Sequence, residues 1–250
     1  MTIRYSGNGI YKYIIKNNLN NYVTFTDKEW LLLYGDENSK PKLMAYVYET
    51  ESMKSSTPQN VINNGRIAYK FSKLLDIPII LIHFAPGSTD VDVFWDNEWE
   101  TNSYAELANI FSQFNLLRKG YTGKDVNRYL SSDFHAWQRN TLGNITVSDF
   151  DLLQTDINGL VTRVFELKRS FYELEYWKPF REDYKNFALL INVLRNTSIN
   201  LNIIYNQFKN GVDYISKVKL FEFECPETAI NKNMVVYEEK GVFSIDSILN

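Results

Sequence analysis

Acidic and basic side chains gather at one place in the sequence, at spacings that could serve catalysis. Asp149 and Asp151 are two residues apart in an expected strand, so both side chains leave the same face of a sheet. Glu166 and Lys168 have the same spacing in the strand that follows. The Asn-Gly pair at 158–159 predicts a tight hairpin turn between these strands, which places the two pairs of residues near each other. We therefore expect three carboxylates and one ammonium group at the end of a sheet.

This combination of groups suits a hard divalent cation. Mg²⁺ takes oxygen ligands and commonly uses one or two carboxylates, with water and substrate phosphate as its remaining ligands. Asp151 and Glu166 suit the ligand role, and Lys168 beside them could orient a water molecule or stabilise developing negative charge. Such a site would hydrolyse a phosphodiester. The alternative is that these residues are ordinary exposed charges on the polar face of a half-solvated hairpin.

The elements that must position these residues are two helices and four strands. Apolar residues recur every three or four positions in 125–140 and in 182–195, and this spacing predicts the two helices. The expected strands are rich in β-branched and apolar residues and cover 144–156, 160–170, 201–208 and 215–224.

The stretch 149–170, DFDLLQTDINGLVTRVFELKRS, resembles the core of the PD-(D/E)xK nuclease superfamily. In that superfamily an Asp opens one strand and an E-x-K motif ends the next. Asp151 matches the motif Asp and is followed by two leucines, and Glu166 and Lys168 match the E-x-K. The order of helix, hairpin, helix and two strands over 125–224 is also similar to the superfamily's arrangement. No proline precedes the Asp, which leaves the choice between Asp149 and Asp151 open.

The resemblance implies an α/β fold with a restriction-endonuclease-like mixed sheet flanked by helices. It also implies Mg²⁺-dependent (or Mn²⁺-dependent) cleavage of DNA, less often of RNA. On this basis the catalytic residues are Asp151, Glu166 and Lys168. The metal ligands are Asp151 and Glu166, with Asp149 as an accessory ligand or as the alternative to Asp151.

The N-terminal part of the chain repeats the order of hairpin, helix and two strands. The expected elements are a hairpin over 24–37 and 42–52, a helix over 64–76 and strands over 78–84 and 90–95. One interpretation is a degenerate repeat of the nuclease-like core. The other is that such short units recur in unrelated α/β proteins.

We divide the chain into an N-terminal α/β block (1–100), a helical connector (101–124) and the nuclease-like core (125–250). In the repeat interpretation, the N-terminal site has been lost and the block is structural or substrate-binding. Glu49 would then match Glu166, while Glu51 stands in place of Lys168.

A second group of side chains suits contact with nucleic acid. Basic residues lie near tyrosines around the start of the core, and one more follows the E-x-K, so they could neutralise phosphates while the tyrosines stack on bases. These residues are Arg118, Lys119, Lys124, Arg128 and Arg169. The alternative is that they are solvated loop charges. His135, in the helix before the hairpin, is either an accessory site residue or a residue that covers the sheet.

Composition restricts the remaining options. The formal net charge of −3 gives little overall attraction to a polyanion, and no apolar run is long enough to span a bilayer. No signal peptide is visible, and a single cysteine cannot form an internal disulfide, so we expect a cytoplasmic protein without a membrane partner. One cysteine and two histidines also exclude a structural zinc site of four Cys or His ligands.

The sequence therefore predicts a metal-dependent endonuclease that acts on DNA or, as the second choice, on RNA. Cutting both strands of a duplex would call for two active sites and hence a homodimer. The alternative is a catalytically silent nucleic-acid-binding or protein-assembly subunit with a nuclease-like fold.

Overall fold

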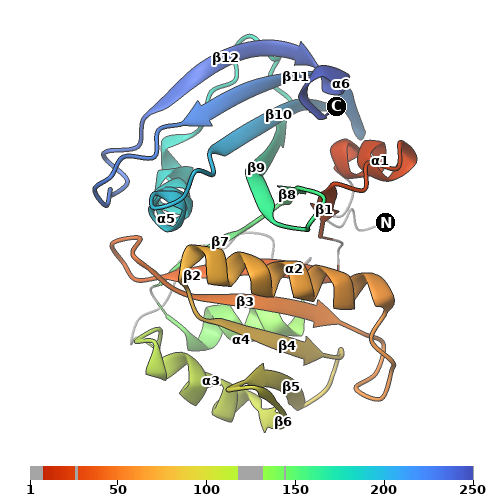
Figure 1. The fold of residues 1–250 in the computed structure, drawn as a ribbon, viewed down its shortest axis with the longest axis vertical. Coiled ribbons are helices and arrows are strands. Elements are labelled where there is room, and N and C mark those ends of the chain that lie inside the picture. The colour runs from red at the N-terminus through yellow and green to blue at the C-terminus, as the bar shows by residue number, and fades with distance from the viewer. Residues whose placement is uncertain (1–7, 26–27, 118–131, 144, 250) are drawn as a thin grey trace.

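The computed structural model describes residues 8–25, 28–117, 132–143 and 145–249. Within these residues the chain is a mixed α/β protein with two six-stranded sheets and six α-helices (Figure 1). The two sheets lie one above the other in Figure 1, and helices lie between them and on their outer faces. No helix in the described part of the chain is long and apolar enough to cross a membrane.

The first half of the chain begins with a helix and ends with a helix. Its elements are α1 (Gly9–Lys16), β1 (Tyr22–Thr24), β2 (Glu29–Gly35), β3 (Pro41–Glu49), α2 (Gln59–Leu75), β4 (Ile79–Phe84), β5 (Asp90–Trp95), β6 (Glu98–Ser103) and α3 (Tyr104–Gln113). The expected helical connector over 101–124 therefore starts as a strand, because β6 runs to residue 103. Residues 118–124 of that connector lie outside the described residues.

The second half has the same succession of helices and strands. Its elements are α4 (Asp133–Thr141), β7 (Thr146–Asp149), β8 (Leu152–Thr155), β9 (Val161–Ser170), a 3₁₀ turn (Arg181–Asp183), α5 (Tyr184–Leu194), β10 (Leu201–Lys209), β11 (Val212–Phe223), β12 (Tyr237–Ser244) and α6 (Ile245–Leu249). The strand expected over 144–156 is thus two strands, β7 and β8. Of the expected helix 125–140, residues 125–131 lie outside the described residues, and α4 begins at residue 133.

The two sheets have the same order and direction of strands. One sheet runs β1-β8-β9-β10-β11-β12, and the other runs β7-β2-β3-β4-β5-β6. In both sheets the third and fourth strands are parallel to each other, and all the remaining neighbouring pairs are antiparallel. We call them sheet A and sheet B.

Each half of the chain gives its first strand to the other half's sheet. β1 pairs with β8 in sheet A, where Val23 lies opposite Leu153. β7 pairs with β2 in sheet B, where Ser148 lies opposite Leu33. The expectation of one contiguous core over 125–224 is therefore wrong for its first two elements, because β7 is a strand of sheet B and α4 packs on that sheet through Phe134.

Three clusters of buried side chains hold these layers together. The largest lies between the sheets and joins their inner faces to α2 and α5, with members such as Leu33, Phe71, Val164 and Phe187. The outer face of sheet B packs against α3 and α4. The outer face of sheet A packs against α1 and α6. Burial of these apolar side chains provides the main stabilisation of the fold.

Candidate functional site

The chain crosses from sheet B to sheet A at Phe150 and Asp151, between β7 and β8. The N–H of Phe150 still donates to the carbonyl of Leu31 in sheet B (2.9 Å), and its ring packs edge-on against Phe71 in the central core. Asp151 comes directly before β8. Asp149 and Asp151 were expected in one strand, and the structure instead places Asp149 at the end of β7 and Asp151 in the crossing.

Glu166 and Lys168 project from β9 toward the inner face of sheet A. The residue between them, Leu167, belongs to the outer cluster with α1, as alternation along a strand requires. Lys168 Nζ lies 2.8 Å from Glu166 Oε1 and 3.8 Å from Asp183 Oδ2. It also lies 5.6 Å from the centre of the Phe187 ring. Glu166 is only 5% exposed, so the alternative that it is an ordinary exposed charge is wrong.

Asp151 is held against the middle of the E-x-K motif. Its Oδ2 accepts a hydrogen bond from the backbone N–H of Leu167 at 2.7 Å. Its backbone carbonyl accepts a second hydrogen bond from the hydroxyl of Tyr11 in α1, at 2.8 Å. These two contacts place the Asp151 carboxylate next to the strand segment that carries Glu166 and Lys168.

The two carboxylates lie in an environment that opposes their ionisation. Burial, followed by the negative charges of Glu166 and Asp149, raises the pKa of Asp151 well above its usual value, although Lys168 and the Leu167 N–H act in the opposite direction. Burial also raises the pKa of Glu166, and Lys168 offsets part of this effect. A bound cation would favour the charged form of both groups.

The same carboxylates keep Lys168 protonated. Burial alone would lower its pKa, but the charges of Glu166, Asp183 and Asp151 outweigh burial and raise the pKa above its ordinary value. Lys168 is therefore a fixed positive charge at neutral pH, which is what stabilisation of a phosphate requires.

The donor atoms fit Mg²⁺ or Mn²⁺ with a small protein ligand set. Glu166 Oε2 is buried and has no hydrogen-bond partner among the described residues, although Oε1 is paired with Lys168. A buried carboxylate oxygen without a partner is costly, and a hard cation would satisfy it. Within the described residues no group of three or more His, Cys, Asp or Glu side chains could hold a metal ion. Two carboxylates, Asp151 and Glu166, would thus leave the other positions to water and substrate.

His135 lies near Asp149 but on the side of sheet B. Its ring packs edge-on against Trp30 (4.9 Å between centroids), and its Nδ1 is 2.8 Å from the Ser132 hydroxyl. Burial lowers its pKa to about 4, while Asp149 acts in the opposite direction, so the ring is neutral at physiological pH. An accessory role for His135 stays a prediction.

Arg169 is engaged in a structural contact. Its guanidinium pairs with Asp213 Oδ2 at 3.1 Å and lies 4.8 Å from the centre of the Phe208 ring. The same carboxylate oxygen accepts the N–H of Gly9 at the start of α1. A phosphate would have to compete with Asp213 for this guanidinium. The other expected nucleic-acid contacts, Arg118, Lys119, Lys124 and Arg128, lie outside the described residues.

Two residues that contact the site were not predicted from the sequence. Asp183 lies just before α5, within the range expected for that helix, and the signal that could have suggested it is an acidic residue at a helix start. Tyr11 comes from α1, a helix that is not among the expected elements. Its contact with Asp151 depends on a pairing between distant parts of the chain.

Comparison with known proteins gives the chain no family. No protein-family model matches it, and no curated protein matches it. One of the solved structures that it resembles is the sex pheromone precursor from Lactobacillus salivarius subsp. salivarius UCC118, with 10% identity and a TM-score of 0.14. The alignment covers 80% of this chain and 62% of that one, so this chain spans less than two thirds of its length.

Proposed function

We propose that the protein is a Mg²⁺-dependent nuclease that hydrolyses phosphodiester bonds in DNA. The single observation that supports this most is that the Asp151 carboxylate lies against the strand segment that carries Glu166 and Lys168, with one buried oxygen of Glu166 left without a described partner. A buried carboxylate (Glu166) and a half-buried one (Asp151) beside a fixed ammonium group are suited to a cation and a phosphate, and less suited to an apolar partner.

Each residue then has a defined task. What Mg²⁺ supplies when bound is polarisation of a phosphoryl oxygen and a bound water of lowered pKa. Asp151 and Glu166 would hold the ion, with Asp149 close enough to influence the charge of Asp151. Lys168, kept in place by Glu166 and Asp183, would orient the water and stabilise negative charge as it develops on the phosphate.

A restriction-endonuclease-like arrangement is part of the proposal. The topology that supports it is composite, because the helix and first strand ahead of the hairpin are α1 and β1 from the start of the chain. The hairpin β8–β9, the helix α5 and the parallel strand β10 follow in the expected order. We further propose a cytoplasmic enzyme that acts on DNA rather than RNA, as a homodimer when it cuts both strands.

The direct test is cleavage of supercoiled plasmid, single-stranded DNA and RNA with Mg²⁺, Mn²⁺ or EDTA. We expect metal-dependent products from the wild type and a loss of at least about 100-fold in Asp151→Asn and in Lys168→Met. Matched controls are Asp90→Asn, on the exposed end of β5, and Lys209→Met, at the exposed end of β10. Equal activity in all five proteins would identify a contaminant and refute the site.

A catalytically silent nucleic-acid-binding or assembly subunit is the second candidate. The observation that favours it is the pairing of Lys168 with Glu166 and Asp183, which leaves the lysine side chain only 27% exposed. This function predicts metal-independent retention on DNA that survives Lys168→Met, without products. A protein that neither cleaves nor is retained on DNA would instead be a protein-assembly subunit.

A further inference from the structure

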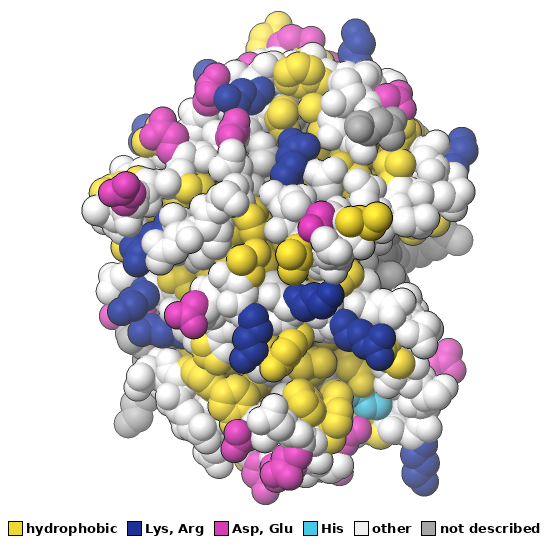
Figure 2. All heavy atoms as spheres, in the orientation of Figure 1, with side chains coloured by type: hydrophobic (Ala, Val, Ile, Leu, Met, Phe, Trp, Pro, Cys, Tyr) yellow, Lys and Arg dark blue, Asp and Glu magenta, His cyan; other side chains and the backbone are white. Residues whose placement is uncertain are grey.

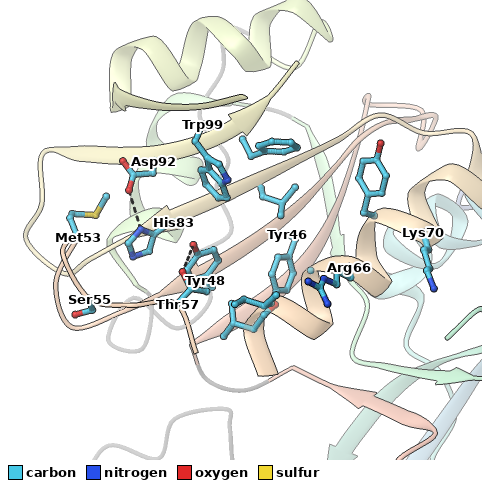
Figure 3. A pocket seen from close by; sticks show the side chains of 16 residues that line it. Tyr46, Tyr48, Met53, Ser55, Thr57, Arg66, Lys70, His83, Asp92 and Trp99 are labelled. Atoms are coloured by element: carbon cyan, nitrogen blue, oxygen red, sulfur yellow. Dashed lines mark hydrogen bonds and ion pairs between the residues drawn. The ribbon is translucent and has the colours of Figure 1, made fainter. Parts of the chain in front are cut away.

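A large pocket opens on the inner face of sheet B, beside α2. Its volume is about 920 Å³, within the range of small-molecule sites. In Figure 2 hydrophobic side chains line a hollow in the lower half of the molecule, and basic side chains follow its upper edge. The pocket lies over β4 and β5, and its walls include Met53 and Thr57 from the loop that joins β3 to α2, and Trp99 from β6 (Figure 3).

The matching place in sheet A is filled by the protein itself. Trp177, in the loop that joins β9 to α5, is 2% exposed and stacks on Tyr205 with 4.2 Å between ring centroids and an interplanar angle of 4°. It also packs edge-on against Phe221 (5.4 Å, 69°). The buried ammonium group of Lys219 fastens the loop, because it donates to the carbonyls of Trp177 (3.2 Å) and Glu175 (3.1 Å).

Strand registers establish which residues correspond. The hairpin irregularity after Tyr34 in β2 recurs after Gln154 in β8, and it aligns β2–β3 with β8–β9. Tyr46 then corresponds to Glu166 and Tyr48 to Lys168. The expected match of Glu49 with Glu166 is therefore wrong, because Glu49 lies on the opposite face of its strand.

The same registers continue across the sheets. His83 pairs with Tyr48 as Tyr205 pairs with Lys168, so His83 corresponds to Tyr205. Phe94 corresponds to Phe221 in the next strand.

Two differences in sequence leave the pocket open in sheet B. The loop 50–58 contains no aromatic residue, so it has no counterpart of Trp177. Asp92 stands where Lys219 stands in sheet A, and an aspartate cannot donate to loop carbonyls. The two side chains that contact the indole in sheet A, Tyr205 and Phe221, thus have aromatic counterparts in sheet B, His83 and Phe94, but no indole from the loop covers them.

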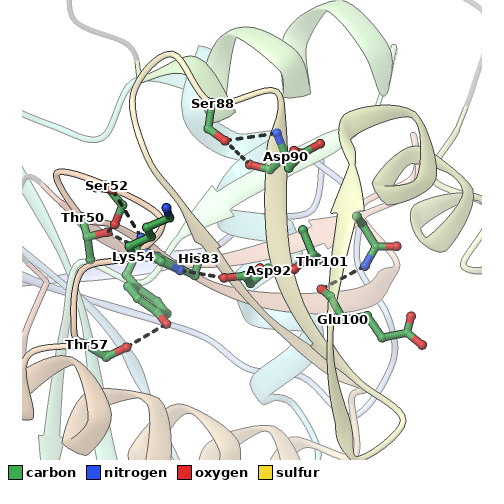
Figure 4. A network of polar contacts seen from close by, with 12 residues as sticks. Thr50, Ser52, Lys54, Thr57, His83, Ser88, Asp90, Asp92, Glu100 and Thr101 are labelled. Carbon is green, nitrogen blue, oxygen red and sulfur yellow. Dashed lines mark hydrogen bonds and ion pairs between the residues drawn. The ribbon is translucent and has the colours of Figure 1, made fainter.

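The polar groups around the pocket are already fixed (Figure 4). His83 Nδ1 lies 3.2 Å from Asp92 Oδ2, and its Nε2 lies 2.7 Å from the Thr50 hydroxyl. The Tyr48 hydroxyl lies 3.2 Å from that of Thr57, and the Tyr48 ring stacks on His83 (4.8 Å, 12°). A ligand would therefore find a preorganised wall, with Phe94 and Trp99 as its contact surfaces.

The rim of the pocket carries positive charge. Arg66 and Lys70 project from α2 at its edge. Arg66 makes no hydrogen bond or ion pair with another described residue, and Lys70 donates only to the carbonyl of Asn158 among them. The one carboxylate at the wall, Asp92, already accepts from Thr101 (2.7 Å) and contacts His83. An anionic group at the rim would be stabilised mainly by Arg66, because Lys70 also interacts with the Asp156 carboxylate.

We propose that this pocket binds a planar heteroaromatic ring that carries a negative charge, of the chemical class of a nucleoside monophosphate. The ring lies over Phe94 and Trp99, in the space that corresponds to the Trp177 indole, and the anion lies at Arg66. This site is separate from Asp151, Glu166 and Lys168, and the inference does not depend on the nuclease function.

Titration calorimetry of the full-length protein with AMP, adenosine and inorganic phosphate tests the proposal. We expect saturable one-to-one binding of AMP and at least about tenfold weaker binding of each fragment, since a charge-assisted contact contributes about 1.5–3 kcal/mol. Arg66→Ala should weaken AMP about tenfold and leave adenosine unchanged. Failure of AMP to saturate at millimolar concentration, or equal affinity for adenosine, overturns the proposal.

A variant in which a new side chain fills the pocket tests whether AMP binds at this place. Ser55→Trp places an indole in the loop that corresponds to the Trp177 loop, and it should abolish AMP binding. Ser56→Trp is the matched control, because Ser56 is exposed and does not line the pocket. Circular dichroism and thermal unfolding confirm that both variants are folded. Wild-type AMP affinity in folded Ser55→Trp would overturn the assignment of this pocket.

Discussion

At the scale of single residues, the stability of the apo protein should depend on the ionisation of Asp151. Its pKa is raised in the folded state, so the folded state favours the protonated form. This contribution to stability is complete below the unfolded pKa of about 4 and is lost as the pH rises through the folded pKa. Asp151→Asn removes the charge and can keep the acceptor for Leu167 N–H.

We therefore expect Asp151→Asn without divalent ions to be about 0.5–2 kcal/mol more stable than the wild type at pH 8. The difference should shrink toward pH 4. Urea unfolding at several pH values measures both effects, and Asp90→Asn is the exposed control. A variant that is less stable than the wild type at pH 8 would contradict the raised pKa of this carboxylate.

Lys219 should matter for stability through the loop that it fastens. It is 1% exposed, pairs with Glu239 Oε1 at 2.8 Å and donates to two loop carbonyls. Lys219→Met should cost about 1–3 kcal/mol, because the carbonyls lose their donor. Urea unfolding measures the cost, and near-ultraviolet circular dichroism reports the packing of Trp177. Lys217→Met, at an exposed position of the same strand, should change neither.

At the scale of elements, the hairpin β8–β9 and the elements after it were predictable because their signals are local. An Asn-Gly turn, alternating apolar residues and a helical apolar stripe lie within short windows, and they placed Glu166 and Lys168 on one face. β6 and β12 were missed because their residues are mostly polar and exposed. β1 is three residues long, and its place in sheet A depends on a partner in the other half.

The exchange of first strands predicts that the two halves of the chain depend on each other. A fragment over 1–124 lacks β7, and a fragment over 125–250 lacks α1 and β1. Each would expose an unpaired strand edge. We expect each fragment alone to aggregate or remain largely unfolded, and the two together to form one cooperatively folding complex. Size-exclusion chromatography and thermal unfolding test this, and two independently cooperative fragments would contradict it.

At the scale of the whole molecule, metal binding and folding should be linked. A cation held by Asp151 and Glu166 binds only where sheet A has brought them together. At 100 times its dissociation constant, such an ion stabilises the folded state by about 2.7 kcal/mol. In a protein of this size that corresponds to a rise in Tm of about 5–11 °C. The rise should be absent in Glu166→Gln and present in Asp90→Asn, and an equal rise in both would refute the site.

The exchange of first strands also sets the order in which a nascent chain can fold. Sheet B cannot close its edge at β2 until β7 has emerged from the ribosome, and β1 must wait for β8. While the first half of the chain is being synthesised, the edge of the hydrophobic strand β2 therefore has no partner strand. Such an edge can bind chaperones or pair with another nascent chain. Because β7 and β8 are consecutive in the chain, the strand that pairs with β2 and the strand that pairs with β1 emerge together, before the rest of sheet A has been synthesised.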